Sequence, residues 1–504
     1  MQSPFRKYLG TNYVPTEEEA DRIRAHLVAH EAALARLDVL IRNLVAHREQ
    51  VKDYIRSHTA LICHPRRLPL DLFQEIFQAC LPTDRNATMR TTEAPLLLCR
   101  ICSPWRTLAL SMPRLWASLT VPANFGGHDG VVVDWLERSA SIPLSISLAC
   151  KWPNSVLEVS CQFSARWHKL DVSDIRVSDF LQVLAEVDAP LLTEVKMAFT
   201  DHTSDKTQVL SSKLLRSVKT ITIHAARHND LVPRAPFTWA HLTHLILDYK
   251  DNNSATGGLS VDTAYRLLRG CTHLVSVQFH LDLDPGQLQS APSLSLPFLQ
   301  SLSFMGHRFV SFNHVADLVE RLDMPNLCHF QMPPSDTGSR RLMTHDSDIA
   351  FLAHLAERSP SISSIGIVPQ TFTRDCLLNT LRRFPSLTSL RAICLWRSRD
   401  GANTIDLLHL LTPDPDTLAT DVCLDLQELS IQTSLRFDDG IWMEFIDKRA
   451  HCGTKLRRLE LEFKTDVSER IPDVQRLLYR DVDVSVKYSP TTFLRLANYI
   501  GNRW

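Results

Sequence analysis

From residue 167 onward the chain repeats one short pattern of apolar and polar positions. Each copy reads apolar, two variable residues, apolar, one variable residue, apolar, as in "LTHLIL" from Leu242. Alternating apolar and polar positions are typical of a half-buried strand, so each copy predicts a short strand. Eleven copies recur at intervals of 24 to 39 residues, and they begin at Trp167, Leu192, Val218, Leu242, Leu274, Leu299, Leu327, Ile362, Leu387, Leu426 and Leu456.

Helical patterns fill many of the gaps between these copies. They cover residues 178–187, 261–270, 314–322, 346–358, 374–384 and 440–450, and several have Ser or Asp at the start or Gly at the end. A strand followed by a helix every 25 to 30 residues resembles the leucine-rich repeat solenoid. The resemblance implies an α/β fold with parallel strands on a concave face and helices on a convex face. The longer intervals predict loop insertions.

Positions one, four and six of each copy are predicted to point into the core, and positions three and five to face outward on the concave sheet. The outward positions carry four acidic and four basic side chains among small polar ones, which suits a protein or peptide partner better than a nucleic acid. The alternative is a face that binds nothing, in an array that acts as a spacer. The candidate target-binding residues are His244, Gln278, His329, Gln331, Arg391, Glu428 and Arg458.

A different pattern occupies the N-terminal part of the chain. Between Thr16 and Ile62 there is neither proline nor glycine, and Ala, Leu, Arg and Glu dominate, which favours one long helix over residues 16–63. Thr16 is predicted to cap this helix, and Glu17 to Glu19 place negative charge at its positive end. Residues 1–15 are predicted to be disordered.

Alternate steps of four and three residues along this helix trace a seam of apolar positions. Nine of its twelve positions are apolar, which is typical of a coiled coil. The helix would either pair with a second copy of the chain, giving a homodimer, or fold back on its own chain, and the pattern leaves both open. The seam consists of Ile23, Leu27, His30, Leu34, Leu37, Ile41, Leu44, Arg48, Val51, Ile55, His58 and Ile62.

Residues 64–120 carry three short helical patterns. "RRLPLDLFQEIFQACLP" predicts an amphipathic helix that starts at a proline, and the polar residues 83–94 predict a loop. "PLLLCRIC" predicts a second helix and "PWRTLALS" a third, for which Ser103 is the expected N-cap and Pro104 the first residue.

Cys99 and Cys102 have the spacing of zinc and thiol redox sites, one helical turn apart. A structural zinc needs four ligands, and no second C-x-x-C or H-x-x-x-H occurs in the chain. A redox pair would be expected at a helix N-terminus, whereas these cysteines lie at the end of a predicted helix. We interpret them as packed helix residues and predict no metal site.

The same segment resembles the F-box. The resemblance rests on a leucine-proline start, an isoleucine-phenylalanine pair, a cysteine-x-x-tryptophan and a leucine-tryptophan end, and it covers residues 66 to 119. The loop from Pro82 to Ala94 is longer than in a typical F-box and resembles the version of mushroom-forming fungi. The resemblance implies a three-helix module that binds the Skp-type adaptor of a cullin-RING ubiquitin ligase. The adaptor-binding residues it implies are Leu68, Pro69, Leu72, Ile76, Phe77, Trp105 and Trp116.

Bulk composition excludes several other functions. The net charge is −1 in 504 residues, which argues against a nucleic-acid partner, and no apolar run is long enough to span a membrane. The twelve cysteines follow no disulfide framework, and the N-terminus lacks the apolar core of a signal peptide, so we expect an intracellular protein, cytoplasmic or nuclear. No phosphate-binding loop, dinucleotide turn, zinc helix or nucleophile elbow occurs, so we predict no catalytic residue, no cofactor and no enzyme activity.

The sequence therefore predicts an interaction protein in several parts. These are the disordered residues 1–15, a coiled-coil helix at 16–63, an F-box module at 64–120, a leucine-rich-repeat-like solenoid at 121–464 and a C-terminal cap at 465–504. By resemblance it is the substrate-recognition subunit of a Skp-cullin-F-box ubiquitin ligase, acting in ubiquitin-dependent degradation of an unidentified protein target. The alternative is a scaffold that uses the same modules without any ligase.

Overall fold

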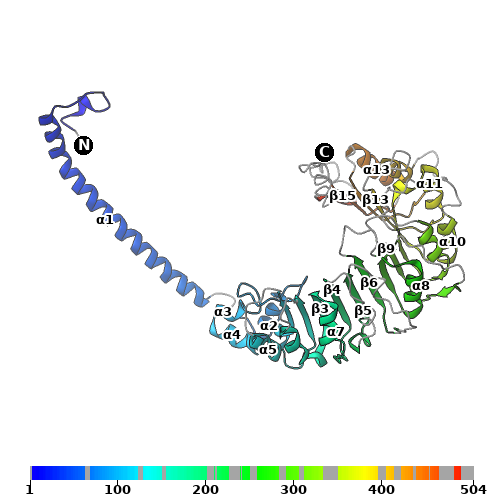
Figure 1. Ribbon diagram of the computed structural model, residues 1–504. Coiled ribbons are helices and arrows are strands. Elements are labelled where there is room, and N and C mark those ends of the chain that lie inside the picture. The colour runs from blue at the N-terminus through cyan, green and yellow to red at the C-terminus, as the bar shows by residue number, and fades with distance from the viewer. Residues whose placement is uncertain are drawn as a thin grey trace, which may run out of the picture. The chain divides into compact units, whose positions relative to one another are not determined.

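The computed structural model divides the chain into two compact units, residues 1–79 and 80–504 (Figure 1). The residues that it describes are 3–62, 68–122, 129–149, 155–200, 209, 213–225, 239, 241–249, 258–282, 291–305, 312–332, 350–394, 404–413, 422–434, 439–452, 455–464 and 482–489. The fold is mixed α/β, with a long helix at the N-terminal end and a large parallel sheet.

The first unit contains α1 (Glu17–Ile62) and α2 (Leu70–Ala79), and the bounds of α1 confirm the long helix predicted over residues 16–63. A reciprocal pair of hydrogen bonds begins α1: the Glu19 N–H donates to Thr16 Oγ1 at 3.4 Å, and the Thr16 N–H donates to Glu19 Oε2 at 3.0 Å. The Tyr13 hydroxyl donates to the same carboxylate, and this bond raises the pKa of Tyr13 to about 12. Thr16 therefore caps α1 as predicted.

Part of the segment that was predicted to be disordered has local structure. Residues Arg6–Tyr8 form a 3₁₀ helix, and the rings of Tyr8 and Tyr13 stack with their centres 4.1 Å apart. The ring of Phe5 lies edge-on to His26 of α1, at 6.2 Å between ring centres. These contacts hold the start of the chain against the first turns of α1.

In the second unit, eleven helices precede, separate or follow the strands. They are α3 (Leu98–Ile101), α4 (Ser103–Leu110), α5 (Asp129–Arg138), α6 (Ser155–Cys161), α7 (Val177–Val183), α8 (Val261–Gly270), α9 (Phe312–Val319), α10 (Ala350–Arg358), α11 (Arg374–Arg382), α12 (Thr404–Leu411) and α13 (Asp439–His451), counted over the described residues. The six helical patterns predicted between the repeats correspond to α7 to α11 and α13. Each predicted helix is therefore confirmed.

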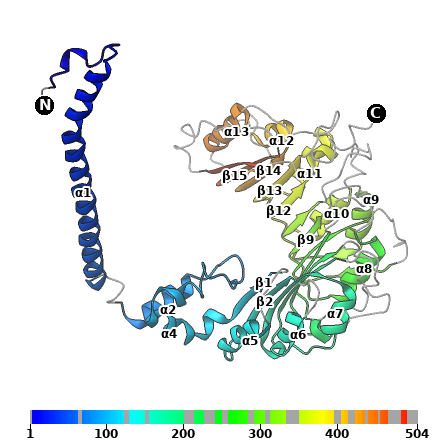
Figure 2. The same ribbon diagram turned by 60° about the vertical axis from the view of Figure 1, so that its left-hand side comes forward.

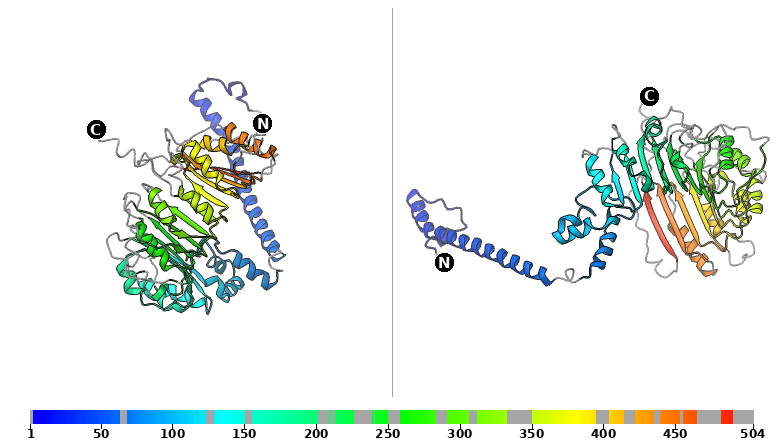
Figure 3. Two further views of the ribbon diagram at one scale, coloured as in Figure 1. Left: turned by 90° about the vertical axis from the view of Figure 1, so that its right-hand side faces the viewer. Right: turned by 90° about the horizontal axis from the view of Figure 1, so that it is seen from below.

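Over the described residues, fourteen parallel strands form one sheet, in which the strands follow one another in chain order and each inner strand pairs with both of its neighbours (Figure 3). The strands are β1 (Ser118–Val121), β2 (Leu144–Ala149), β3 (Trp167–Ile175), β4 (Glu194–Phe199), β5 (Thr220–Ala225), β6 (His244–Tyr249), β7 (Ser276–His280), β9 (Ser301–Met305), β11 (His329–Gln331), β12 (Ser364–Ile367), β13 (Ser389–Cys394), β14 (Glu428–Thr433), β15 (Arg458–Lys464) and β16 (Asp483–Ser489). A separate parallel pair joins β8 (Leu294–Ser295) and β10 (Leu322–Asp323).

All eleven predicted strands are confirmed, as β3 to β7, β9 and β11 to β15. The sheet also contains β1, β2 and β16, which the repeat pattern did not predict. In β2 the first apolar position of the pattern is taken by Pro143, and in β1 it is taken by Trp116, which was assigned to the helical module. β16 lies inside the predicted C-terminal cap, whose residues 465–481 and 490–504 are outside the described part of the chain.

The helices lie along one side of the sheet, and the core lies between the two layers (Figure 2). Position four of each repeat points to the helices: Leu245, Leu302 and Leu390 are at most 1% exposed. The phenyl rings of Phe279, Phe304 and Phe330 meet edge-on from strand to strand, with centres 5.4 and 6.0 Å apart. Apolar residues at positions four and six of neighbouring repeats thus build one continuous core.

A buried arginine ties the last repeats together. Arg449 of α13 is 1% exposed, and its guanidinium donates to the backbone carbonyl oxygens of Leu411, Cys423 and Val422 at 2.9 to 3.4 Å. Leu411 is the last residue of α12, where carbonyl groups lack partners within the helix and carry partial negative charge. The guanidinium of Arg449 on α13 therefore donates a hydrogen bond to a backbone carbonyl that has no partner within α12.

Two predicted helix starts need correction. α4 begins at Ser103 with Cys102 as its N-cap, so Ser103 is the first helical residue and Pro104 the second; the extended backbone of Cys102 ends α3 and starts α4 at once. α7 begins at Val177, one residue before the predicted Ser178, with Arg176 in the cap position. By contrast, Ser260 and Thr373 cap α8 and α11 with their side chains.

The inward leucines should dominate the stability of the second unit. We expect Leu302→Ala to lower the free energy of unfolding by about 2 to 5 kcal/mol, because it leaves a cavity in a fully packed core. Arg391→Ala on the opposite side of the sheet should change it by no more than about 0.5 kcal/mol. Urea denaturation followed by circular dichroism measures both; equal effects would contradict the assignment of inward and outward faces.

Candidate functional site

The side of the sheet away from the helices, called the open face here, is organised by strand register. Residues at position three pair across the whole sheet, as Lys169 does with Glu194 and Glu428 with Arg458. Position five forms a second row that includes Asp171 and, on the next strand, Lys196. Position seven, one step further along each strand, forms a third row. Side chains of one row are neighbours, so this face presents two rows in which polar groups predominate and a third row of polar and apolar residues, Ala149 and Ala198 among them.

Opposite charges on β3 and β4 are matched in both of the first two rows. Lys169 Nζ lies 2.6 Å from Glu194 Oε2, and Lys196 Nζ lies 3.8 Å from Asp171 Oδ2. Partial burial raises the pKa of Asp171 in spite of the neighbouring lysine. The open face is thus nearly neutral at this end, and each charge has a partner on the adjacent strand.

In the third row a carboxylate lies between two histidines. Asp248 of β6 accepts hydrogen bonds from His224 of β5 at 3.0 Å and from His280 of β7 at 3.4 Å. These two hydrogen bonds hold the pKa of Asp248 well below its usual range, and the bond from His224 contributes more than the bond from His280. His280 is 6% exposed, while Asp248 remains about one-third exposed and reaches the surface. The cluster therefore keeps a negative charge on the open face and links three strands.

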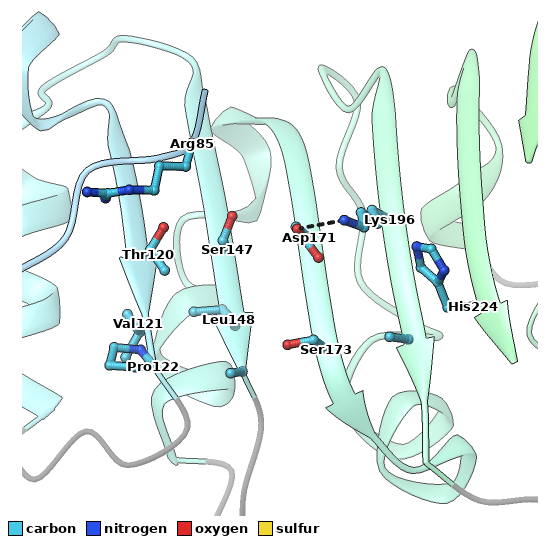
Figure 4. A pocket seen from close by; sticks show the side chains of 12 residues that line it. Arg85, Thr120, Val121, Pro122, Ser147, Leu148, Asp171, Ser173, Lys196 and His224 are labelled. Atoms are coloured by element: carbon cyan, nitrogen blue, oxygen red, sulfur yellow. Dashed lines mark ion pairs between the residues drawn. The ribbon is translucent and has the colours of Figure 1, made fainter. Parts of the chain in front are cut away.

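The open face is hollowed where its side chains are smallest (Figure 4). Ala149, Ser173 and Ala198, on β2, β3 and β4, line a cavity of about 470 Å³. Larger polar side chains that line the same cavity are Arg85, Asp171, Lys196 and His224. The cavity offers hydrogen-bond donors and acceptors together with a little apolar surface, which suits part of a polypeptide.

Arg85 comes from the loop that was predicted over residues 83–94. Its guanidinium donates to both oxygens of Glu93, at 2.6 and 3.3 Å, and this contact is the main cause that lowers the pKa of Glu93 to about 2. The loop also continues the sheet: the Thr120 N–H donates to the Ala87 carbonyl at 2.7 Å, and Asn86 Nδ2 donates to Ser147 Oγ at 2.9 Å. The long loop thus forms one wall of the cavity.

The predicted target-binding residues fall into three groups on this face. His244 and Gln278 lie on the neighbouring strands β6 and β7, and Glu428 and Arg458 on β14 and β15. The third group is His329, Gln331 and Arg391, on β11 and β13; His329 Nδ1 lies 2.8 Å from Ser364 Oγ between them. Burial, and secondarily the charge of Arg391, lower the pKa of His329.

One of these residues is not available for binding. Gln331 is 9% exposed, because its side chain folds over Gly366 of the next strand and its Nε2 donates to the Met332 carbonyl at 2.9 Å. A Cβ at position 366 would collide with the side-chain oxygen of Gln331, so only glycine leaves room for this arrangement. The prediction that Gln331 faces a target is wrong, although His244, Arg391, Glu428 and Arg458 are exposed.

The predicted adaptor-binding residues also divide by exposure. In the first unit Pro69, Leu72 and Ile76 are exposed and Leu68 is half-buried, but Phe77 is fully buried. In the second unit Trp105 is half-buried. Among the predicted residues on α2, these placements leave Leu72 and Ile76, 49% and 42% exposed, as the ones that a partner can reach.

Trp116 is a core residue of the second unit. It is fully buried, its indole N–H donates to the Ala109 carbonyl at 2.9 Å, and its ring lies edge-on to Trp135 at 4.9 Å. Arg138 lies over the other side of the indole, 4.9 Å from the ring centre. The prediction that Trp116 contacts an adaptor is corrected: this tryptophan joins the helical segment to the first strands of the sheet.

Sequence reasoning missed Arg85, His224, Asp248 and His280. The repeat pattern ends at position six, so it assigns nothing to position seven, where His224, Asp248 and His280 lie. A polar residue placed one step after the last apolar position in three consecutive repeats is the signal that could have found them. No comparable signal exists for Arg85, because loop residues follow no repeating pattern of apolar and polar positions.

The interpretation of the two cysteines as packed helix residues is confirmed for the helical position of Cys99 and is wrong for Cys102, which is exposed and has extended backbone between α3 and α4. Cys99 lies within α3 and Cys102 is the residue that ends it, and burial raises the pKa of the Cys99 thiol, which favours the protonated form. Across the part of the chain that the structure describes, no group of three or more His, Cys, Asp or Glu side chains could hold a metal ion. In the same part, no helix combines the length and the apolar character needed to cross a membrane.

Comparisons with known proteins add little to this geometry. No family model and no curated protein matches the chain. A crystal structure of a protein from Bacteroides fragilis aligns at 15% sequence identity with a TM-score of 0.32, over 53% of this chain and 71% of that chain. A similarity at this level carries no argument about fold or function, so the site must be judged by its own chemistry.

The Asp248 cluster predicts a specific dependence of stability on pH. The folded state lowers the pKa of Asp248, so its contribution to stability is complete above the ordinary value of about 4 and is lost as the pH falls toward the depressed one. We expect the gap in melting temperature between the wild type and Asp248→Asn to narrow as the pH falls below about 4, because protonation of Asp248 then removes the charge that the substitution removes. Calorimetry over this range measures it, and a gap that widens in acid would contradict the cluster.

Proposed function

We propose that the chain is the target-recognition subunit of a Skp-cullin-F-box ubiquitin ligase. In this proposal residues 64–120 are an F-box-like module that binds the Skp-type adaptor, and the repeat sheet is a leucine-rich-repeat-like solenoid whose open face binds a protein target. The observation that carries the proposal is the exposure of apolar side chains on the short helices of the module-like segment, in a chain whose sheet keeps its apolar residues covered.

C-terminal to α1, most of the exposed large apolar side chains in the described residues lie in this segment. On α2, Leu70, Leu72 and Ile76 are 42% to 59% exposed. In the second unit Leu97, Ile101 and Leu110, in and beside α3 and α4, are 42% to 53% exposed. Taken separately, each of these two sets of exposed apolar side chains is typical of a surface that another protein covers. Three of the six, Leu72, Ile76 and Ile101, are positions of the F-box resemblance in sequence, which supports the Skp-type adaptor as that protein.

The open face supports the second half of the proposal. It has a mixed and nearly balanced set of charges, hydroxyl groups and a cavity, and such a composition suits recognition of a polypeptide. Most of its polar side chains are held by neighbours on adjacent strands, so a target would meet a surface that is already ordered.

The proposed role requires no bond chemistry from this chain. The module would fix the chain on the ligase, and the sheet would hold the target beside the ubiquitin-charged enzyme. The rate gain would come from proximity, because a tethered lysine of the target reacts with an effective concentration far above that of free protein.

The adaptor-binding half can be tested with surface variants of α2. We expect Leu72→Asp combined with Ile76→Asp to abolish recovery of a purified Skp-type adaptor in a pull-down, because each change places a charge in an apolar contact. Both side chains are exposed, so folding should be unaffected. Phe77 is fully buried and is unsuitable for this purpose.

A matched control is Leu191→Asp, which changes an equally exposed leucine, 50% accessible, outside the module-like segment. This variant should bind the adaptor as the wild type does. If the wild type recovers no adaptor, the ligase assignment is wrong and a scaffold role replaces it.

The target-binding half can be tested in cells. Target proteins should be proximity-labelled by the wild type only when the proteasome is inhibited. We expect this labelling to be lost when Arg391 and Arg458, both exposed on the open face, are changed to serine. The control changes Arg269 and Arg383, which are exposed at the ends of α8 and α11, to serine. Equal labelling by both double variants would argue against the open face as the target site.

A further inference from the structure

The seam of α1 is exposed over most of its length. Leu34, Leu37, Ile41 and Leu44, at the middle of the helix, are 55% to 67% exposed, and Val51 and Ile55 are 43% and 57% exposed. Among the seam positions whose burial the structure describes, only Ile23 and His30, near the start of the helix, are half-buried. A soluble chain rarely leaves such a long apolar stripe in water, so this face is built to be covered.

The spacing of the seam identifies the kind of surface that covers it. A straight α-helix has 3.6 residues per turn, so a stripe that repeats every seven residues drifts around the helix unless it supercoils with a helical partner. The seam keeps the seven-residue spacing from Ile23 to Ile62. A sheet or a loop surface would not require that period, whereas a second helix with the same period does.

The partner helix must also be long. α1 has 46 residues, whereas the next longest helix in the described part of the chain, α13, has 13 residues. None of those shorter helices could cover the seam from end to end. A second α1 matches both the length and the period, which makes a second copy of the chain the fitting partner.

The polar positions in the seam favour one orientation of the two helices. In a parallel pair each residue meets its own copy, so Arg48 would face Arg48, His30 would face His30 and His58 would face His58. Two guanidinium groups at one core layer repel each other. In an antiparallel pair centred between residues 42 and 43, these three residues meet Leu37, Ile55 and Leu27 of the second copy instead, and the apolar layer of Ile41 against Leu44 occupies the centre.

Charges beside the seam agree with the antiparallel pair. In that arrangement Glu31 of one copy lies beside Lys52 of the other, and the symmetry makes two such contacts. In a parallel pair Lys52 lies beside His47 instead, which offers no negative charge. Lys52 now pairs with Glu49 of its own helix at 2.6 Å, on an exposed surface where such a pair is weak, so its side chain can turn to Glu31.

We infer that two copies of the chain associate through α1 as an antiparallel coiled coil, with Ile41 of one copy opposite Leu44 of the other at its centre. This pairing stands apart from the proposed adaptor and target, because none of the residues involved belongs to the module-like segment or to the sheet. It would join two ligase receptors, or two scaffolds, end to end through their N-terminal helices.

Analytical ultracentrifugation of the full chain tests the pairing. The wild type should sediment as a dimer, and Leu44→Glu should raise its dissociation constant at least about a hundredfold, since a charge would be buried in a central layer. The matched control is Val39→Glu, which changes an exposed apolar residue on the opposite side of α1 and should remain dimeric. A monomeric wild type would overturn the inference, including the cases in which α1 folds back or pairs with another protein, and so would a dimer that Leu44→Glu leaves intact.

A charge exchange tests the orientation. Glu31→Lys alone and Lys52→Glu alone should each weaken the dimer about fivefold, because each creates two like-charge contacts. A mixture of these two variants should form mixed dimers in preference to either pure dimer, and the double variant should regain wild-type affinity. Without this recovery the antiparallel orientation is wrong.

Discussion

In-register pairing between neighbouring strands is the constraint on which the rest of this structure depends. Because neighbouring strands of the sheet pair in register at positions three to five of their repeats, the apolar positions four and six line up on one side of the sheet and the polar positions three and five on the other. The apolar side meets the helices and forms the core. The polar side remains open, and its side chains pair across strands because the register brings opposite charges to adjacent positions, as for Lys169 and Glu194.

Much of this arrangement could be predicted from the sequence, because the same pattern of apolar and polar positions recurs in every repeat. Eleven strands and six helices were predicted, and Leu302 and Leu390 are buried as their positions require. β2 was missed because Pro143 replaces the first apolar residue, and the local pattern is then too short. Arg449 was missed for another reason: a buried arginine on a helix looks like a surface residue until the carbonyl groups around it are known.

The candidate site was less predictable than the fold. Alternation shows which residues face away from the core, but not whether the next strand leaves them exposed, so Gln331 was predicted to bind although it covers Gly366. Burial of Trp116 and Phe77 likewise depends on packing that a motif does not describe. Arg85 lines the cavity from a loop whose position is fixed only by contacts distant in sequence, such as the bond from Asn86 to Ser147.

The proposed function combines two surfaces of different chemistry on one chain: exposed apolar helices for a constant partner, and an ordered polar sheet for a variable one. The most direct measurement of this division is hydrogen–deuterium exchange of the full chain with and without a purified Skp-type adaptor. The account predicts slower exchange confined to residues 68–79 and 96–110, with the strands from β6 to β15 unchanged. No protection in those helices, or protection of the strands instead, would contradict it.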